Sequence, residues 1–218
     1  MATREAMPFG PIVVTFDETV LRPRPWTLAQ SEWAAELAAG AEPLLEIGCG
    51  AGHIGLAAAA LSGSRLVQVD RDPAACRWAA VNAADNGCDD LAQQRLGAAG
   101  DALADGERFP VVIADPPYVP SAEVHLYPED PLAAIDGGPD GLDGVCDFLA
   151  AVEDHLEVRG SVILQVRGIA QVEQLRAWLA QLASPALKVA EARSYGETRA
   201  LVRLMHRSSA PVEPLRSA

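Results

Sequence analysis

The chain has 218 residues and a formal net charge of −13. This length suits one α/β domain, and half of the residues are hydrophobic, so a full core can be buried. No apolar run reaches the roughly 18 residues of a membrane span, and Met1 to Pro11 lack a basic segment followed by an apolar stretch. Because an acidic chain repels phosphate backbones, nucleic acid is a disfavoured partner. We expect a cytoplasmic protein that binds no membrane.

The four cysteines, Cys49, Cys76, Cys88 and Cys146, are scattered along the chain. They form no CxxC pair and have no histidine nearby at ligand spacing, the two arrangements typical of a metal site. We therefore expect free thiols in a reducing cytosol and no bound metal.

Residues 1–40 are expected to form an N-terminal extension. The stretch Ile12–Val20 can hold one or two short strands. The stretch Thr27–Ala39 is predicted to be a helix, because Pro25 precedes it, Thr27 can cap it and apolar residues recur at helical spacing.

From Leu44 onward, strand-like apolar segments alternate with helical segments. The predicted strands are Leu44–Ile47, Arg65–Asp70, Leu91–Leu96, Pro110–Ala114 and Ser161–Val166, followed by a hairpin of Leu187–Ser194 and Arg199–His206. The predicted helices are His53–Leu61, Pro73–Asn86, Leu142–Leu156 and Gln171–Leu182. This order predicts an α/β fold with a doubly wound, mostly parallel sheet and a C-terminal antiparallel hairpin. Residues 41–206 would form this domain, and residues 207–218 a flexible tail.

A glycine-rich loop follows the first strand of this domain. Glu46 lies at the end of the strand, and Gly48, Gly50 and Gly52 come after it. Glycines here let the backbone turn sharply and approach a ligand at the carboxyl end of the strand. Alone the loop is a weak signal, because an ordinary strand-to-helix turn has the same pattern.

Two acids make this loop more specific. Asp70 ends the next strand, about 20 residues further on, where a carboxylate can accept both hydroxyl hydrogens of a ribose; Arg71 beside it is included in the predicted site. Glu46 places negative charge near the loop, which suits the sulfonium and amino groups of S-adenosylmethionine. A nicotinamide dinucleotide, with its pyrophosphate, is the weaker alternative, and no Walker-type GK[ST] sequence is present.

A third acid follows the third strand. Asp101 can hold the adenine amino group and Ala102 can offer a backbone amide. An ordinary turn acid would have the same pattern. We include both residues in the predicted cofactor site.

The most specific chemical signal is the tetrapeptide Asp115-Pro116-Pro117-Tyr118, directly after the fourth strand. Its prolines immobilise the loop and remove two donors. The Asp115 carboxylate and the Pro116 carbonyl can both accept from one incoming NH₂ group, while Tyr118 stacks on its plane. Such acceptors return electron density to a poorly nucleophilic amide or aryl amine nitrogen and stabilise the charge that develops on it. The loop predicts methyl transfer to a planar nitrogen; a structural Asp-Pro turn is the alternative.

With these residues placed, most of the chain resembles the release-factor glutamine methyltransferases of the HemK type. The matching segments are residues 20–27 (VLRPRPWT, like VLIPRPET), 45–52 (LEIGCGAG), 115–119 (DPPYV, like NPPYI), 127–142 (like EP..AL.GG.DGL) and 195–199 (YGETR, at a Gly-x-x-Arg turn). The resemblance implies the Rossmann-like class I methyltransferase fold, S-adenosylmethionine as cofactor and a protein glutamine side chain as acceptor, with a translation release factor as one candidate partner. It also implies a short relative without the family's N-terminal helical domain.

Four positions differ from the family: Asp115 stands where it has asparagine, Trp26 and Leu28 replace two of its acids, and Gln165 stands where a glutamate is expected. Pro117, Arg24 and His125 are expected near the substrate, although a solvated linker for Arg24 and a surface loop for His125 are the alternatives. An RNA amino-group or small-molecule methyltransferase remains an alternative function. Outside the enzymes, the alternative is a non-catalytic subunit that binds the cofactor or a partner.

Overall fold

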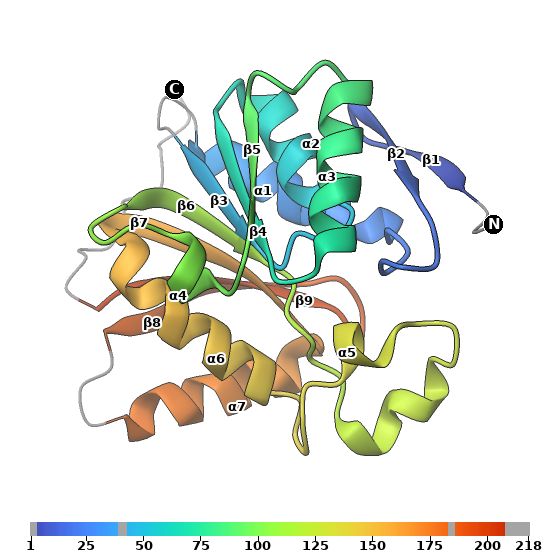
Figure 1. The fold of residues 1–218 in the computed structure, drawn as a ribbon. Coiled ribbons are helices and arrows are strands. Elements are labelled where there is room, and N and C mark those ends of the chain that lie inside the picture. Colours follow the sequence, from blue (N-terminus) through green and yellow to red (C-terminus); the bar gives the residue numbers. More distant parts are fainter. Residues whose placement is uncertain (1–3, 39–42, 183–185, 208–218) are drawn as a thin grey trace, which may run out of the picture.

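The computed structural model describes residues 4–38, 43–182 and 186–207 (Figure 1). The strands are β1 (Glu5–Phe9), β2 (Ile12–Phe16), β3 (Leu44–Ile47), β4 (Leu66–Asp70), β5 (Ala92–Leu96), β6 (Phe109–Ala114), β7 (Leu156–Val166), β8 (Leu187–Ser194) and β9 (Ala200–His206). The α-helices are α1 (Leu28–Ala38), α2 (His53–Ser62), α3 (Pro73–Asp85), α4 (Ala99–Ala102), α5 (Leu132–Ile135), α6 (Asp143–Val152) and α7 (Gly168–Gln181). Short 3-10 helices occupy Pro25–Thr27, Ser121–Leu126 and Glu153–His155.

Seven strands form one sheet in the order β5-β4-β3-β6-β7-β9-β8. The first five of these run parallel, and β9 pairs antiparallel with both β7 and β8. The chain moves outward from β3 to β5, then returns to place β6 on the other side of β3. The predicted doubly wound sheet with its C-terminal antiparallel hairpin is therefore confirmed, and its switch point lies between β3 and β6.

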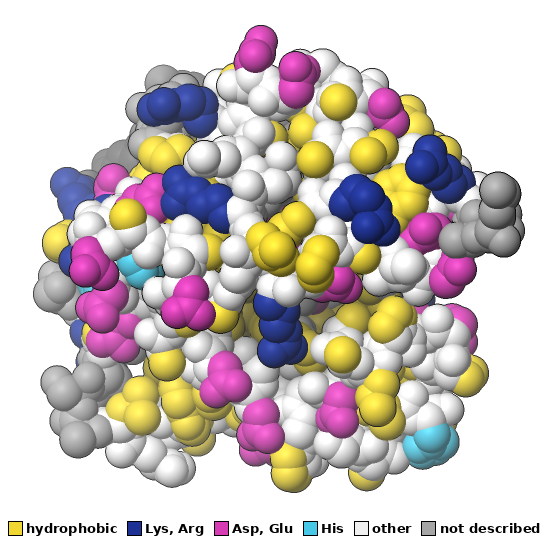
Figure 2. All heavy atoms as spheres, in the orientation of Figure 1, with side chains coloured by type: hydrophobic (Ala, Val, Ile, Leu, Met, Phe, Trp, Pro, Cys, Tyr) yellow, Lys and Arg dark blue, Asp and Glu magenta, His cyan; other side chains and the backbone are white. Residues whose placement is uncertain are grey.

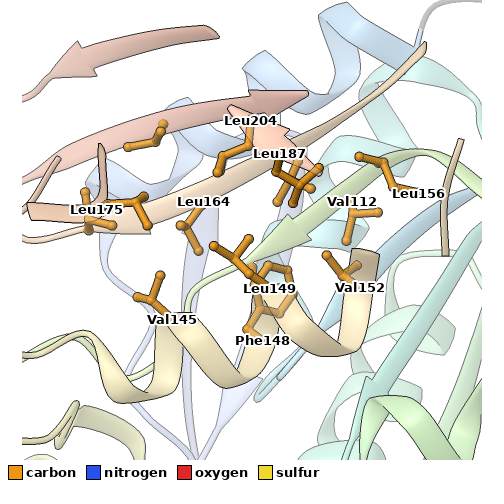
Figure 3. Close-up of a cluster of buried hydrophobic side chains, with 14 of the residues drawn as sticks. Val112, Val145, Phe148, Leu149, Val152, Leu156, Leu164, Leu175, Leu187 and Leu204 are labelled. Carbon is orange, nitrogen blue, oxygen red and sulfur yellow. The ribbon is translucent and has the colours of Figure 1, made fainter. Parts of the chain in front are cut away.

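Helices cover both faces of this sheet (Figure 1). On one face α1, α2 and α3 enclose a core of small and aliphatic side chains, among them Ala57, Ile54 and Leu44. On the other face α6 and α7 pack against β6, β7 and β9. Figure 3 shows α6 directing Phe148 and Leu149 toward the strands. Two buried cores thus hold the strand ends in fixed positions.

The hairpin of β1 and β2 is attached to α3 by side chains. Asn82 accepts from the Thr15 amide at 2.7 Å and donates to the Thr15 carbonyl at 2.9 Å. It also donates to the carbonyl of Ala51 in the glycine-rich loop at 2.8 Å. The N-terminal hairpin is therefore connected to the loop through one buried asparagine.

Several predictions differ from the structure. The first strand of the N-terminal hairpin, Glu5–Phe9, was not expected; Pro8 is tolerated in it because the strand lies at an edge. The strand predicted to begin at Ser161 begins at Leu156, and the helix predicted to begin at Gln171 begins at Gly168. The predicted helix Leu142–Leu156 ends at Val152, and β7 already begins at Leu156. The end of the predicted helix at Ala39 and residues 208–218 of the predicted tail lie outside the described residues.

Acidic side chains are spread over the face shown in Figure 2, and the arginines there are separated from one another. Within the described residues, no helix is long and apolar enough to cross a membrane. No cluster of three or more potential metal ligands occurs in that same part of the chain.

Candidate functional site

Two loops meet at the switch point of the sheet. Ile47 and Ala114 are paired neighbours at the carboxyl ends of β3 and β6. The glycine-rich loop starts after Ile47, and the Asp115 tetrapeptide starts after Ala114. Parallel pairing thus brings together the two loops that the sequence singled out.

A cavity of about 240 Å³ opens beside the glycine-rich loop. Its wall contains these predicted site residues: Glu46, Gly48, Gly50, Asp70, Arg71, Asp115, Pro116 and Pro117. Gly48 and Gly50 have φ angles of 71° and 52°, and a Cβ on either would meet nothing within 4 Å. Their backbone is therefore open to a ligand, as a glycine cradle requires.

Gly52 has a different role. It lies at the start of α2 with φ 77°, and a Cβ there would approach Ala79 and Gln68 to 2.8 Å. This glycine allows close packing of the loop on α3 rather than contact with the cavity.

Asp70 holds the glycine-rich loop and still has acceptor capacity. Its Oδ2 accepts from the Gly50 amide and its Oδ1 from the Asp72 amide, both at 2.9 Å. An ionised carboxylate has about four lone-pair sites, so two remain for ligand hydroxyls.

Glu46 is buried and already occupied by protein donors. Gly55 donates its amide at 3.0 Å and Gln68 donates Nε2 at 2.6 Å. Burial raises the pKa of Glu46 to about 7, while these two hydrogen bonds oppose the shift. Glu46 therefore ties β3 to α2 and β4 as well as lining the cavity. A Cβ on Gly55 would lie 2.4 Å from the carboxylate, which explains a glycine inside this Ala-rich helix.

Asp115 stands where the first cavity meets a second one. Among the residues that the structure describes, neither its carboxylate nor the Pro116 carbonyl receives a hydrogen bond. Burial, followed by the charge of Glu46, raises the pKa of Asp115 to about 7, and the nearby Arg24 lowers it. The Asp115 carboxylate and the Pro116 carbonyl thus have unused acceptor capacity beside the first cavity.

The second cavity, which we call the acceptor cavity, measures about 130 Å³. Tyr118 lines it, and its hydroxyl accepts from Gln165 Nε2 at 2.8 Å. Arg24 also lines it and forms an ion pair with Asp130, whose side chain is 4% exposed. This pair joins the N-terminal segment to the loop after β6 across the cavity.

The glycine-rich run of residues 137–144 supports the tetrapeptide from behind. Val119 donates to the Ile135 carbonyl and accepts from the Gly137 amide, both at 2.9 Å. A Cβ on Gly137 or Gly144 would lie 2.7 or 2.8 Å from the Pro117 carbonyl. These glycines therefore let the tetrapeptide pack against the start of α6.

Besides Gly52, three predicted site residues are not brought to either of these two cavities. Asp101 is exposed on α4, and Ala102 faces Gly97 while its carbonyl accepts from Arg95. Instead, Ala98 and the neighbouring Gly97 and Ala99 line a third cavity of about 580 Å³, which shares Gly48, Asp70, Arg71, Pro116, Pro117 and Ala133 with the first. His125 is exposed on the 3-10 helix Ser121–Leu126 and lines neither of the first two cavities.

Several site residues were missed by sequence reasoning. Thr19, Val20 and Leu21 line the first cavity, and Trp26, Gln165 and Arg199 line the acceptor cavity. For Thr19, Val20, Leu21 and Trp26, the sequence signal was the neighbouring segment Pro23-Arg24-Pro25. For Gln165 the signal was its unusual polarity at the end of an apolar strand. His53 lines the first cavity as well, and burial lowers its pKa to about 3, so it is neutral.

Comparison with known proteins agrees with this geometry. A family model described as "Ribosomal protein L11 methyltransferase (PrmA)" matches residues 27–115. A release factor glutamine methyltransferase of Geobacter sulfurreducens is 36% identical over 163 residues, which cover 71% of this chain and 55% of the relative. A ribosomal protein uL3 glutamine methyltransferase of Bordetella pertussis is 31% identical over 169 residues, covering 75% and 52%. The chain spans about half the length of these curated relatives.

Solved structures share the fold. The hMettl16 catalytic domain, in complex with an RNA hairpin, has a TM-score of 0.72 at 16% identity and covers 93% of this chain and 78% of its own. The ribosomal protein L11 methylase from Lactobacillus delbrueckii subsp. bulgaricus has a TM-score of 0.61 at 17% identity, covering 86% and 82%. At such identities the likeness shows the fold alone.

The sheet order, the glycine-rich loop with Asp70 and these matches together identify the fold of the class I methyltransferases, which use S-adenosylmethionine. Within that class, the chain is a relative of the release factor glutamine methyltransferases. The expected fold and resemblance are both confirmed. The cavity fits the cofactor, because the backbone of Gly48 and Gly50 is open to it and Asp70 retains free lone pairs.

Proposed function

We propose that this chain transfers a methyl group from S-adenosylmethionine to a side-chain carboxamide, with a glutamine of a protein as the acceptor. A release factor or a ribosomal protein is the partner that the names of its relatives suggest. The single observation that carries the proposal is the pair of unused acceptors, the Asp115 carboxylate, which lines both cavities, and the carbonyl of Pro116, which lines the first.

The first and third cavities would hold the cofactor. Asp70 would accept from its ribose hydroxyls, and the open backbone of Gly48 and Gly50 would contact it. Its purine would extend past Asp70 toward Ala98 and Ala99, in place of the predicted contacts to Asp101 and Ala102. When bound, S-adenosylmethionine supplies an electrophilic methyl group.

The tetrapeptide would prepare the acceptor nitrogen. Asp115 and Pro116 each accept one N–H bond, which orients the lone pair and returns electron density to nitrogen. Fixed acceptors need no reorganisation as positive charge develops on the nitrogen. An ionised Asp115 can also take up the proton that the methylated nitrogen releases.

The size of the acceptor cavity favours a side chain over a nucleobase. An engineered cavity of about 150 Å³ holds one benzene ring. The acceptor cavity, at about 130 Å³, is smaller than that, and a purine is larger than benzene. A carboxamide side chain therefore fits without rearrangement of the loop.

Replacement of Asp115 by alanine tests the proposal. We expect Asp115→Ala to lower kcat for a glutamine-containing peptide by about a hundred- to a thousandfold, the usual effect of losing one preorganised transition-state contact. Binding of S-adenosylhomocysteine, measured by calorimetry, should be retained. His125→Ala is the control variant, because His125 lies nearby in the chain but lines neither cavity, and its activity should match the wild type.

A tritiated-methyl assay against cell extract, separated into protein, RNA and small molecules, tests the substrate class. Label at a glutamine in the protein fraction is the expected result. Label in RNA alone, or full methyl transfer by Asp115→Ala, would refute the proposal.

A further inference from the structure

A buried glutamine at the end of β7 makes a hydrogen bond that the mechanism above does not use. Gln165 is 2% exposed, lines the acceptor cavity and donates Nε2 to the Tyr118 hydroxyl. Its Oε1 is buried and has no hydrogen-bond partner within the described part of the chain. A buried amide oxygen left without a donor costs about 1–3 kcal/mol, so a protein rarely retains one without a reason.

The direction of this bond determines what Tyr118 can do. Because the phenol oxygen accepts from Gln165, its own proton remains available to the cavity. If the side-chain amide of Gln165 were flipped by about 180°, Oε1 would accept from Tyr118 and Nε2 would become the available donor. In both arrangements, the pair formed by Gln165 and Tyr118 offers one donor beside the two acceptors of Asp115 and Pro116.

We infer that Gln165 is a positioning residue that sets the Tyr118 hydroxyl to donate to the acceptor's carbonyl oxygen, so that the site selects carboxamides over amines. This inference rests on the proposed function. A carboxamide presents an NH₂ group and a carbonyl oxygen in one plane, which matches two acceptors and one donor. An alkyl amine would leave the buried donor unpaired, and unpaired polar groups discriminate strongly against such analogues.

The pair is held in place by the sheet. Gln165 follows Leu164, the β7 residue paired with Ala114, so it lies across from Asp115. Gln30, from α1, donates Nε2 to the carbonyls of Ala114 and Ile163 and so links the ends of β6 and β7. Gln165 is therefore held by paired strands at a fixed position relative to the start of the loop that carries Asp115, Pro116 and Tyr118.

A double-mutant cycle tests this inference. The variants are Gln165→Met, Tyr118→Phe and the combination, each assayed with a glutamine peptide and with the same peptide carrying ornithine, in which a CH₂ group replaces the carbonyl and the nitrogen is a basic amine, at a pH at which part of that amine is unprotonated. We expect Gln165→Met to lower kcat/KM for the glutamine peptide by about ten- to a hundredfold and to change the ornithine rate little. In the Tyr118→Phe background, Gln165→Met should have almost no further effect, because it acts through the hydroxyl.

The controls separate this inference from the proposed function. S-adenosylhomocysteine binding and Tm show whether each variant is folded. Gln165 does not line the first cavity, which we call the cofactor cavity, so a folded Gln165→Met should bind this ligand as the wild type does. Suppose that the wild type methylates the glutamine peptide and that Gln165→Met lowers kcat/KM equally for both peptides, or for neither. The inference is then overturned and the proposed function stands. If the wild type binds the glutamine peptide without methylating it, and Gln165→Met selectively weakens that binding, the inference holds and the proposed function fails. A wild type that neither binds nor methylates the glutamine peptide overturns both.

Discussion

The Asp115 carboxyl has two free acceptor oxygens only when it is ionised, and its surroundings oppose ionisation. Burial and the charge of Glu46 raise its pKa to about 7. Below that pH the carboxyl carries a proton and becomes partly a donor, so it no longer matches an NH₂ group. We expect kcat/KM for the acceptor to rise with pH through about 7 and to level off above it, measured between about pH 5.5 and 9.

Two measurements separate Asp115 from Glu46, whose pKa is also about 7. Asp115→Asn should remove the dependence of kcat/KM on pH in this range, because the amide does not titrate. The pH dependence of cofactor binding, measured alone, reports Glu46. An unchanged pH profile in Asp115→Asn would assign the titration to another group.

A role for the tetrapeptide could be proposed from the sequence because Asp115 and the two prolines lie within four consecutive positions. Gln165 could not, because its partner Tyr118 is 47 residues away and the two meet only through the pairing of β6 with β7. Asp101 shows the opposite error. The sequence shows an acid after the third strand, but α4 turns it outward and leaves Ala98 and Ala99 at the cavity.

At the scale of elements, Asn82 on α3 joins the N-terminal hairpin to the glycine-rich loop. Asn82→Ala would leave the amide and carbonyl of Thr15 and the carbonyl of Ala51 without these partners. We expect a loss of about 2–3 kcal/mol in the free energy of unfolding, measured with urea. Asn86→Ala is the matched control: it bonds the backbone of Val13 at the exposed end of the same hairpin, so its loss should stay below about 1 kcal/mol. Equal losses in the two variants would contradict this assignment.

Elements with strong apolar patterns were predicted closely, β3 and β8 to the residue. The misses arise where tertiary contacts decide. Pro8 is acceptable because β1 pairs with β2 alone. The apolar pattern that suggested a helix up to Leu156 continues into β7, where the residue is buried as part of a strand.

At the scale of the whole molecule, cofactor binding should stabilise the domain. A ligand at about 100 times its Kd adds about 2.7 kcal/mol, which raises Tm by about 5–10 °C for a domain of this size. Asp70→Ala should largely remove this shift with S-adenosylhomocysteine in a thermal melt, because Asp70 lines the cavity and holds Gly50. Asp101→Ala should retain it, because Asp101 is exposed on α4. If Asp101→Ala loses the ligand-induced shift in Tm, Asp101 contacts the cofactor, as the sequence suggested.

The cofactor cavity and the acceptor cavity have only three wall residues in common: Leu21, Asp115 and Ala134. The two cavities draw on the N-terminal segment and on the loop after β6 at mostly different residues, and the final hairpin contributes Thr198 and Arg199 to the acceptor cavity alone. Substitutions at positions such as Trp26, Tyr127 or Arg199 can therefore reshape what is methylated while leaving the methyl donor's site intact. This separation gives the scaffold room to diversify: new acceptors can be explored, by evolution or by protein engineers, without rebuilding the part that handles the donor.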